Sequence, residues 1–528
     1  MSTYLTKQSI KRAIDHLEKF GDTDVFPHLV EIVFLNEMKD QVVEELTKLD
    51  LDNFSPAQAV ETISPKSRYG FRIVHQPLLL EALLYTAATI EIASDLEKLK
   101  RPLDTFGPFG YRFSSEGDGS LFHKDRNYRD WLIWQSDAAS SGEYTHVIAT
   151  DIADFYQRIY MHRIENCLDT ATANKGVKKF IEKLIKQIRS RQSHGIPVGG
   201  TASRLVAEAI LADSDNALAD ENIRSTRFVD DFRIFVQQNQ NPYTILAFLA
   251  DQLAASEGLS LNAQKTKLFS KDEFEIFLAE QTGDAFEDAE KQAIQDLSNA
   301  LYFDEQPDED DLARLRALSL LDMLTDELTE EVWDFGKIKA IFRALRLAPD
   351  AQSVEPIFDN FDDFIPFVKD LVLYLEALES EPDADLGSLK GKILSQMTSG
   401  AAATVPVIRV WLLELFVRDV FDISTAELNS LGLTESIENR QMYLIKGLNE
   451  DVNYFRRQKT RFEERNNYEK SAFILGATCL PKDEFETWIG AIKPNMIRPL
   501  ERLFCDWAKT KSGKLRDILA ARSELLRD

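Results

Sequence analysis

One stretch of this chain sets the expectation for its fold: Thr226-Arg227-Phe228-Val229-Asp230-Asp231-Phe232-Arg233-Ile234-Phe235-Val236. Aromatic and β-branched residues favour strands, so the stretch predicts a β-hairpin with Asp230 and Asp231 where the chain reverses. Two adjacent acids repel each other, and this repulsion costs stability unless something compensates for it. A divalent cation would compensate, since hard metals such as Mg²⁺ bind carboxylate oxygens together with substrate phosphates. Taken alone, the pair is also compatible with a solvated acidic turn.

The composition indicates a chain with a sizeable core and no disulfide framework. Its 528 residues predict several domains, or two large ones, and 44% of them are hydrophobic. The three cysteines, Cys167, Cys479 and Cys505, lie far apart without metal-like spacing, which fits a reducing compartment. Residues 1–20 lack the apolar region of a signal peptide, and no run approaches the roughly 18 apolar residues of a membrane span. The sequence therefore predicts a cytoplasmic protein with no membrane partner.

The charge is unevenly distributed along the chain. A net charge of −26 argues against a surface built for tight binding of duplex nucleic acid. Residues 1–270 have a net charge of −6 and residues 271–528 one of −20, so most of the acidity belongs to the second half. Residues 151–200 instead contain 9 basic and 5 acidic side chains. A basic helix is predicted over residues 173–191, either as a phosphate-facing surface or as an ordinary solvated face.

A second, basic hairpin is predicted over residues 64–77, and it carries Lys66 and Arg72. Lysine acts as a point charge and arginine can bind phosphate through two donors, so the pair suits a triphosphate. An ordinary charged hairpin would have the same sequence pattern.

Further polar residues lie where predicted strands and helices begin or end. The strand over residues 145–150 ends at Asp151, on the rim of a sheet where metal sites are often built, and Tyr156 follows five residues later. Gly199 and Ser203 lie where a glycine-rich turn enters a helix, which permits close approach of a substrate and favours anions. Lys265 lies in a turn before a short strand. Each of these signals is weak by itself.

The order of these motifs along the chain is a more specific signal than any single motif. Three carboxylates from two elements of one sheet are the layout needed for two-metal nucleotidyl transfer. A basic hairpin, a strand with an aspartate, a glycine turn, an Asp-Asp hairpin and a lysine-bearing turn follow one another here. In this order the chain resembles the reverse transcriptases across roughly residues 60–270.

The resemblance implies a polymerase centre with two Mg²⁺ ions, or Mn²⁺ in their place. Asp151 matches the first metal-binding aspartate of the family, and Asp230 and Asp231 match the aspartate pair of the palm hairpin. Lys265 matches the lysine proposed to protonate the leaving pyrophosphate.

The resemblance also implies deoxynucleoside triphosphates as substrates. Lys66 and Arg72 match the fingers residues that hold the triphosphate, and Tyr156 matches the aromatic gate that disfavours a 2′-hydroxyl. Gly199 and Ser203 match the block beneath the nucleotide and the template.

Two positions depart from the family pattern. The middle block reads Pro197-Val198-Gly199, where template-copying reverse transcriptases usually have Pro-Gln-Gly. Val198 cannot make the polar contacts of glutamine, which puts ordinary templated selection in doubt. The hairpin reads Phe-Val-Asp-Asp in place of the commoner Tyr-x-Asp-Asp, which is a mild change.

The second half has a different character, because helical periodicity dominates residues 276–528. Successive helices with short connections suggest an α-solenoid or HEAT-like array. The acidic stretch Asp304–Asp311 is predicted to be a linker or solvated loop. The predicted fold is an α+β fingers-palm reverse transcriptase core over residues 1–275, followed by an all-α HEAT-like domain over residues 276–528.

A palm without a recognisable thumb, joined to a large helical half, resembles the abortive-infection reverse transcriptases of the AbiK type. These are bacterial or prophage-encoded phage-resistance proteins. The resemblance implies template-independent DNA synthesis primed from a tyrosine of the protein itself, a single-stranded DNA product attached to the chain, and a homo-oligomer. Which of the 14 tyrosines would prime is open, with Tyr4 as one candidate.

Two other functions remain open. The chain could copy a partner RNA, as retron-type enzymes do. Alternatively, the helical half could be a binding scaffold or toxin whose polymerase is vestigial. The presence of all three aspartates and of the aromatic gate disfavours the scaffold hypothesis.

Overall fold

The computed structural model describes residues 2–116, 119–141, 143–190, 192–282, 313, 315–316, 318–331 and 333–526. Two compact units are present, and each consists of several chain segments. The first contains Met1–Ala13, Asp50–Gln58 and Leu84–Pro307, and the second contains Ile14–Leu49, Ala59–Leu83 and Asp308–Asp528. The domain boundary between residues 275 and 276 stays a prediction. The acidic stretch Asp304–Asp311 lies outside the described residues.

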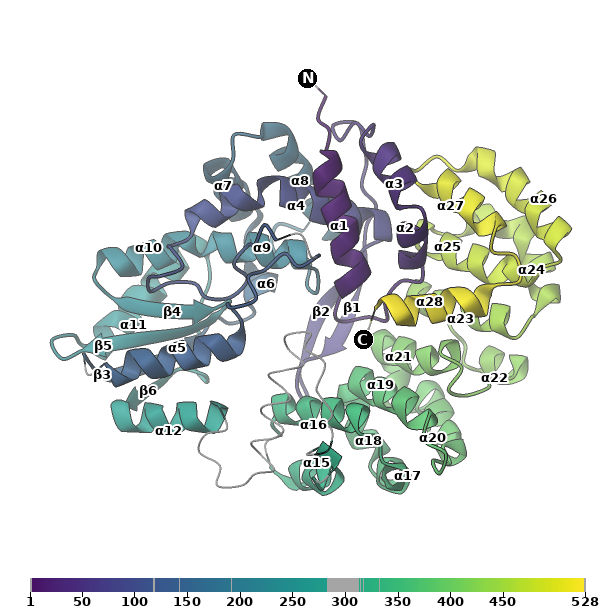
Figure 1. Ribbon diagram of the computed structural model, residues 1–528. Coiled ribbons are helices and arrows are strands. Elements are labelled where there is room, and N and C mark those ends of the chain that lie inside the picture. Colours follow the sequence, from purple (N-terminus) through teal and green to yellow (C-terminus); the bar gives the residue numbers. More distant parts are fainter. Residues whose placement is uncertain are drawn as a thin grey trace. The chain divides into compact units, whose positions relative to one another are not determined.

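The first unit is built around a four-stranded antiparallel sheet with the strand order β4-β5-β3-β6 (Figure 1). The hairpin consists of β4 (Arg224–Phe228) and β5 (Asp231–Gln237). On its other edge β5 pairs with β3 (Tyr144–Asp151), which in turn pairs with β6 (Lys267–Ser270). The stretch that predicted a hairpin therefore provides one edge strand and one central strand of the sheet.

Both faces of this sheet are covered, because successive side chains of β5 point to opposite sides. On one side Phe235 packs in an apolar cluster with residues of α5 (Tyr128–Ser140) and α12 (Lys271–Thr282). On the other side Phe232 lies beside the buried guanidinium of Arg227. The covered sheet gives a rigid support to residues at its end.

The other helices described between residues 7 and 252 connect these strands or precede them. They are α1 (Lys7–Phe20), α2 (Ile32–Glu37), α3 (Lys39–Leu46), α4 (Leu79–Leu99), α6 (Phe155–Arg158), α7 (Met161–Ala171), α8 (Lys175–Ile188), α9 (Thr201–Ile210), α10 (Ala212–Asp220) and α11 (Pro242–Gln252). None of the described helices is both long and apolar enough to cross a membrane.

The second unit combines a two-stranded hairpin, β1 (Val60–Pro65) and β2 (Phe71–Gln76), with many helices. In the described part of residues 313–526 every regular element is helical, which confirms the prediction of a helical C-terminal region. A HEAT-like arrangement of these helices stays a prediction. They are α15 (Leu320–Thr329), α16 (Phe335–Leu347), α17 (Val354–Asp359), α18 (Phe361–Phe364), α19 (Val368–Glu379), α20 (Gly387–Thr398), α21 (Pro406–Val417), α22 (Thr425–Ser430), α23 (Ser436–Leu448), α24 (Val452–Gln458), α25 (Asn467–Gly476), α26 (Lys482–Ile492), α27 (Glu501–Lys509) and α28 (Leu515–Leu525).

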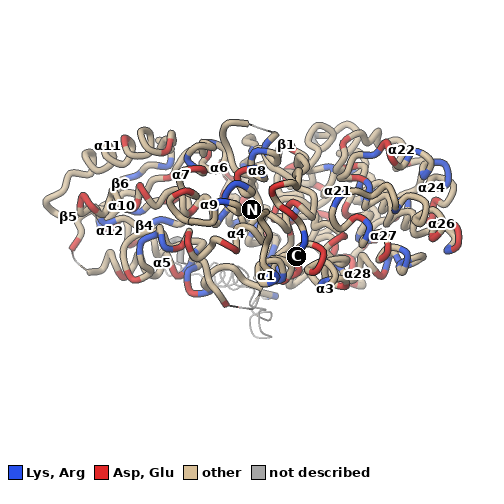
Figure 2. The backbone as a smooth tube through the Cα atoms, turned by 90° about the horizontal axis from the view of Figure 1, so that it is seen from above, with Lys and Arg blue, Asp and Glu red and all other residues tan. Residues whose placement is uncertain are grey.

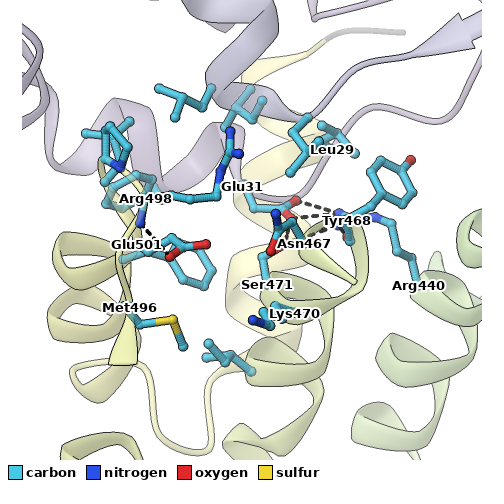
Figure 3. Close-up of a pocket in the computed structure, with 18 residues that line it drawn as sticks. Leu29, Glu31, Arg440, Asn467, Tyr468, Lys470, Ser471, Met496, Arg498 and Glu501 are labelled. Atoms are coloured by element: carbon cyan, nitrogen blue, oxygen red, sulfur yellow. Dashed lines mark hydrogen bonds and ion pairs between the residues drawn. The ribbon is translucent and has the colours of Figure 1, made fainter. Parts of the chain in front are cut away.

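A buried ion pair holds the N-terminal segment of the second unit to its C-terminal helices (Figure 3). Arg440 Nη2 donates to both carboxylate oxygens of Glu31, at 2.8 and 2.7 Å, although the two residues are 409 positions apart. Arg440 Nη1 donates to the Tyr468 carbonyl at 2.6 Å, and the Ser471 hydroxyl donates to Glu31. These side chains line a cavity of about 110 Å³. Residues near Glu31 thus belong to the core of the helical unit.

Candidate active site

The structure brings the three predicted aspartates to one end of the four-stranded sheet. Asp151 is the last residue of β3 and lies directly opposite Asp231, the first residue of β5. Asp230 occupies the hairpin turn, and its carbonyl accepts a hydrogen bond from the Ile152 N–H at 3.0 Å. Because two adjacent strands contribute the three carboxylates, their separation is set by the sheet itself.

This end of the sheet concentrates negative charge. Burial, followed by the nearby carboxylates of Asp151 and Asp231, raises the pKa of Asp230 to about 7. Lys265 opposes this charge, and its Nζ lies 3.1 Å from Asp151 Oδ2. Burial lowers the pKa of Lys265, but the carboxylate of Asp151 and the other two acids raise it overall. One lysine thus faces three acids.

The residues fit a divalent cation by their chemistry, although their side chains do not surround one. In the described part of the chain, no three His, Cys, Asp or Glu side chains lie close enough together to hold a metal ion. Asp231 Oδ1 instead accepts a hydrogen bond from Arg233 Nη1 at 2.9 Å, while Asp151 faces Lys265. Carboxylate oxygens with excess negative charge are the ligands that Mg²⁺ prefers. Binding of Mg²⁺ would require these two ion pairs to loosen.

A buried arginine braces the turn that carries Asp230. Val229 has a φ of +59°, a left-handed conformation that costs free energy for a β-branched residue. Arg227 Nη1 donates to the Val229 carbonyl at 2.8 Å. The same guanidinium binds Asp215 of α10 through two donors, each at 2.9 Å, and also the carboxylate of Glu208 in α9. The strained turn is therefore held by a fully buried ion network.

Tyr156, the predicted gate, lies close to the aspartates. Burial and the neighbouring Tyr111 raise the pKa of its hydroxyl, and Asp230 also contributes. Its backbone carbonyl accepts a hydrogen bond from the Ile196 N–H at 2.8 Å, which links α6 to the glycine-rich block. The ring is half-buried. The geometry is consistent with a gate, and the role itself stays a prediction.

The glycine-rich block makes a sharp turn into α9. Gly199 has a φ of +109°, a conformation that side chains rarely adopt, whereas Gly200 has an ordinary φ of −90°. Ser203, in the first turn of the helix, is buried, and its hydroxyl donates to the Tyr85 hydroxyl at 3.4 Å. In this structure Ser203 is a packed residue, and a contact with nucleotide or template stays a prediction.

Lys66 and Arg72 lie on the β1–β2 hairpin, which belongs to the second compact unit. Lys66 is exposed in the turn, where its N–H donates to the Gly70 carbonyl at 2.8 Å. Arg72 is half-buried and lies near Lys339, whose pKa is lowered by burial and by Arg72 although the carboxylate of Asp370 raises it. Their binding of a triphosphate stays a prediction.

Sequence reasoning did not assign roles to Arg227 and Arg233, the two arginines beside the hairpin tip. Both are buried, at 0% and 4% exposed, and both contact carboxylates. A signal was present, since arginine is almost never fully buried unless it is paired, and both residues stand inside otherwise apolar strands. The partners of Arg227, Glu208 in α9 and Asp215 in α10, could not be identified without the tertiary structure. The partner of Arg233, Asp231, lies two residues away in the same strand.

The comparisons with known proteins agree with this site at the level of a domain. Residues 94–283 match the family model described as "Reverse transcriptase (RNA-dependent DNA polymerase)". The matched range includes Asp151, Asp230, Asp231 and Lys265, so the chain contains a reverse transcriptase-type domain there. No curated protein matches the chain.

Two telomerases are among the solved structures that are similar to this chain. A Candida albicans telomerase in complex with a fragment of telomeric RNA is 14% identical, with a TM-score of 0.29, over 71% of this chain and 70% of that chain. Apo telomerase from Candida tropicalis is 12% identical, with a TM-score of 0.32, over 72% of this chain and 73% of that chain. Similarity at this level supports no argument about function.

Proposed function

We propose that this protein is a DNA polymerase of the reverse transcriptase type. The observation that carries the proposal is the cross-strand pairing of Asp151 with Asp231 beside Asp230 in its braced turn. These residues lie inside the range that matches the reverse transcriptase family model. A solvated acidic turn would need neither a third carboxylate on the neighbouring strand nor a buried brace.

Each residue has a defined part in this proposal. Asp151, Asp230 and Asp231 would hold the metal ions, which, when bound, supply activation of a hydroxyl and stabilisation of the leaving pyrophosphate. Tyr156 excludes a 2′-hydroxyl by its bulk. Lys265, whose Nζ lies 3.1 Å from Asp151, would give a proton to the leaving pyrophosphate.

The finer proposal is template-independent synthesis primed by a tyrosine, in phage defence by a homo-oligomer. It rests on the resemblance to the AbiK type and on Val198 in place of glutamine. A priming hydroxyl must be accessible. Among the described residues the tyrosines with large exposed fractions are Tyr4 (50%), Tyr69 (84%), Tyr160 (42%) and Tyr243 (82%).

The direct test is incubation of the purified protein with Mg²⁺ and labelled deoxynucleotides, without template or primer. The chain itself should become labelled, and both EDTA and the Asp230→Asn/Asp231→Asn variant should abolish the label. Tyr→Phe variants of the four exposed tyrosines, followed by peptide mapping, would identify the primer. Absence of label, or label that persists in the double variant, would contradict the proposal.

A second candidate is RNA-templated synthesis, which the description of the matched family favours because it names an RNA-dependent polymerase. It predicts that RNA co-purifies with the protein and sets the product sequence. Sequencing the product decides between the candidates: a defined sequence complementary to a bound RNA supports templating, and a random sequence excludes it.

The role in phage defence needs a cellular test. Phage plating efficiency should be lowered by the wild-type protein and restored by a variant that lacks all three aspartates. Full resistance in that variant would assign the defence to the helical half and make the polymerase dispensable.

A further inference from the structure

The first unit contains a groove that the proposed polymerase centre does not use. It lies between α7, α8 and the segments around Ser55 and Ser193, and its volume is about 950 Å³. We refer to it as the α7–α8 groove. All residues that line it belong to the first compact unit.

One wall of the α7–α8 groove is a row of lysines on α8. Figure 2 colours the Lys and Arg positions along the backbone blue. Lys179, Lys183 and Lys186 follow one another at intervals of four and three residues, so they lie on one side of the helix along about 10 Å. The opposite side of α8 is fixed in the core through buried residues such as Phe180 and Leu184. The lysine row is therefore held in place by the packing of the helix.

The positive charge of this wall is only partly neutralised. Lys186 pairs with Glu165, and the other acid in the groove, Glu182, pairs with Lys178 outside it. Lys183 Nζ donates to the backbone carbonyls of Asp52 and Phe54, which carry no net charge. Among the described residues no carboxylate pairs with Lys179 or Lys183. In a chain with a net charge of −26, two such cations side by side favour an anionic ligand.

The groove also presents two exposed rings, Tyr160 and His162, with their centroids 5.5 Å apart. Tyr160 is held in position by a bridge to His194 and by close packing against Gly258. A Cβ on Gly258, which has a φ of +68°, would come within 2.3 Å of the Tyr160 ring, so another residue at this position would be strained and would displace the ring. The aromatic end of the groove is thus a built feature of the fold.

The segments that hold the aromatic end of the groove continue along the chain toward elements of the candidate active site. His194 precedes the glycine-rich block that ends at Gly199. Four residues after Gly258, the Asn262 N–H donates to the Asp151 carbonyl at 2.7 Å. The segments on which the aromatic end depends are thus linked through the chain to the glycine-rich block and to a residue bound to Asp151.

We propose that the α7–α8 groove binds single-stranded nucleic acid, with phosphates on Lys179, Lys183 and Lys186 and a base stacked on Tyr160 or His162. A row of cations that follows the backbone, combined with aromatic platforms for the bases, is the pattern of single-strand binding. Duplex nucleic acid keeps its bases stacked and out of reach of such rings. The proposal does not require the protein to polymerise anything.

The test is fluorescence anisotropy with labelled 12-nucleotide oligo(dT) and oligo(U) in EDTA, where no metal-dependent chemistry can occur. Removal of two phosphate contacts in Lys179→Ala/Lys183→Ala should weaken binding and reduce the slope of log K against log salt by about 1.4. Tyr160→Ala should weaken binding by about 5- to 150-fold, the range for loss of one stacked base. Tighter binding of oligo(dT) identifies a DNA strand such as a product, and tighter binding of oligo(U) identifies an RNA.

The matched control, compared with the single variant Lys179→Ala, is Lys175→Ala, which removes one exposed charge from the same helix outside the groove and should leave affinity nearly unchanged. If the double variant fails to fold, Lys179→Glu, which changes one exposed side chain, takes its place and should also weaken binding. The proposal is overturned if a duplex of equal length binds as tightly, or if the groove variants and the control lose the same affinity. An Asp151→Asn variant without nucleotide addition should still bind the strand, so failure of the polymerase proposal is distinguishable from failure of this one.

Discussion

Two hairpins with charged tips carry four of the residues that the sequence singled out, namely Lys66, Arg72, Asp230 and Asp231, and they are built in opposite ways. The β4–β5 hairpin lies in a covered sheet, with Phe232, Ile234 and Phe235 fully buried. The β1–β2 hairpin forms a sheet of only two strands and exposes Tyr69 and Phe71 at its tip, at 84% and 53%.

The tips of the two hairpins are also held by different kinds of contact. The turn at the acidic tip is held by the buried Arg227, which is itself bound to two buried carboxylates. The basic tip is attached from the side, where the Arg68 guanidinium lies 3.9 Å from the centre of the Trp333 ring. A two-stranded hairpin is marginal by itself. The difference fits the proposed function, in which the carboxylates would need a fixed geometry and Lys66 and Arg72 would need only to be available to a ligand.

The largest effect should follow from removal of a carboxylate at the braced tip. Asp230→Asn should lower nucleotide incorporation by about 1000-fold or more, because loss of a metal ligand removes several kcal/mol of transition-state stabilisation. Folding should be retained, since the change also removes repulsion among Asp230, Asp151 and Asp231. Single-turnover incorporation measures the loss of activity, and thermal melting measures whether folding is retained. Substantial residual activity would mean that Asp230 binds no metal.

Removal of the brace should have the next largest effect. Arg227→Ala leaves the buried Glu208 and Asp215 without their partner and should lower the free energy of unfolding by about 3–5 kcal/mol. Lys66→Ala, on the exposed hairpin tip, is the matched control and should change it by less than about 0.5 kcal/mol. Urea denaturation measures the free energy of unfolding of both variants. Equal losses would show that the two tips are supported alike.

A smaller effect is expected at the turn into α9. Gly199→Ala must adopt a φ of +109° and should lose about 1–3 kcal/mol of stability, with reduced incorporation. Gly200→Ala is the neighbouring control, because its φ of −90° suits any residue. Denaturation midpoints and incorporation rates of both variants provide the measurement. Similar behaviour of the two alanines would contradict a conformational requirement at Gly199.

The smallest effect should come from the basic tip. Arg72→Ala should raise the apparent KM for deoxynucleotide by about 10-fold, equivalent to ~1.4 kcal/mol, with little change in kcat, because uniform binding is lost. Steady-state kinetics with labelled deoxynucleotide would detect it. A fall in kcat at constant KM would instead place Arg72 in the transition state and remove the proposed contrast between the hairpins.

Much of the fold could be read from local patterns. The alternation around Asp230 and Asp231 predicted the hairpin, and the strand before Asp151 was predicted nearly to its end. Helical periodicity correctly indicated the helical C-terminal region. These features depend on neighbours in sequence, because strand alternation and helical repeat are local properties of the chain.

The sequence by itself determined the carboxylates, their order and the chemistry they could support. Only the tertiary structure decided what holds them. Asp151 and Asp231 are 80 positions apart, and Lys265 and Asp151 are 114 positions apart. Arg227 binds Glu208 and Asp215, which lie 19 and 12 positions before it. The Thr150–Thr266 hydrogen bond joins the regions of Asp151 and Lys265 across 116 positions. Such contacts depend on the burial of charge among several elements, which no local pattern encodes.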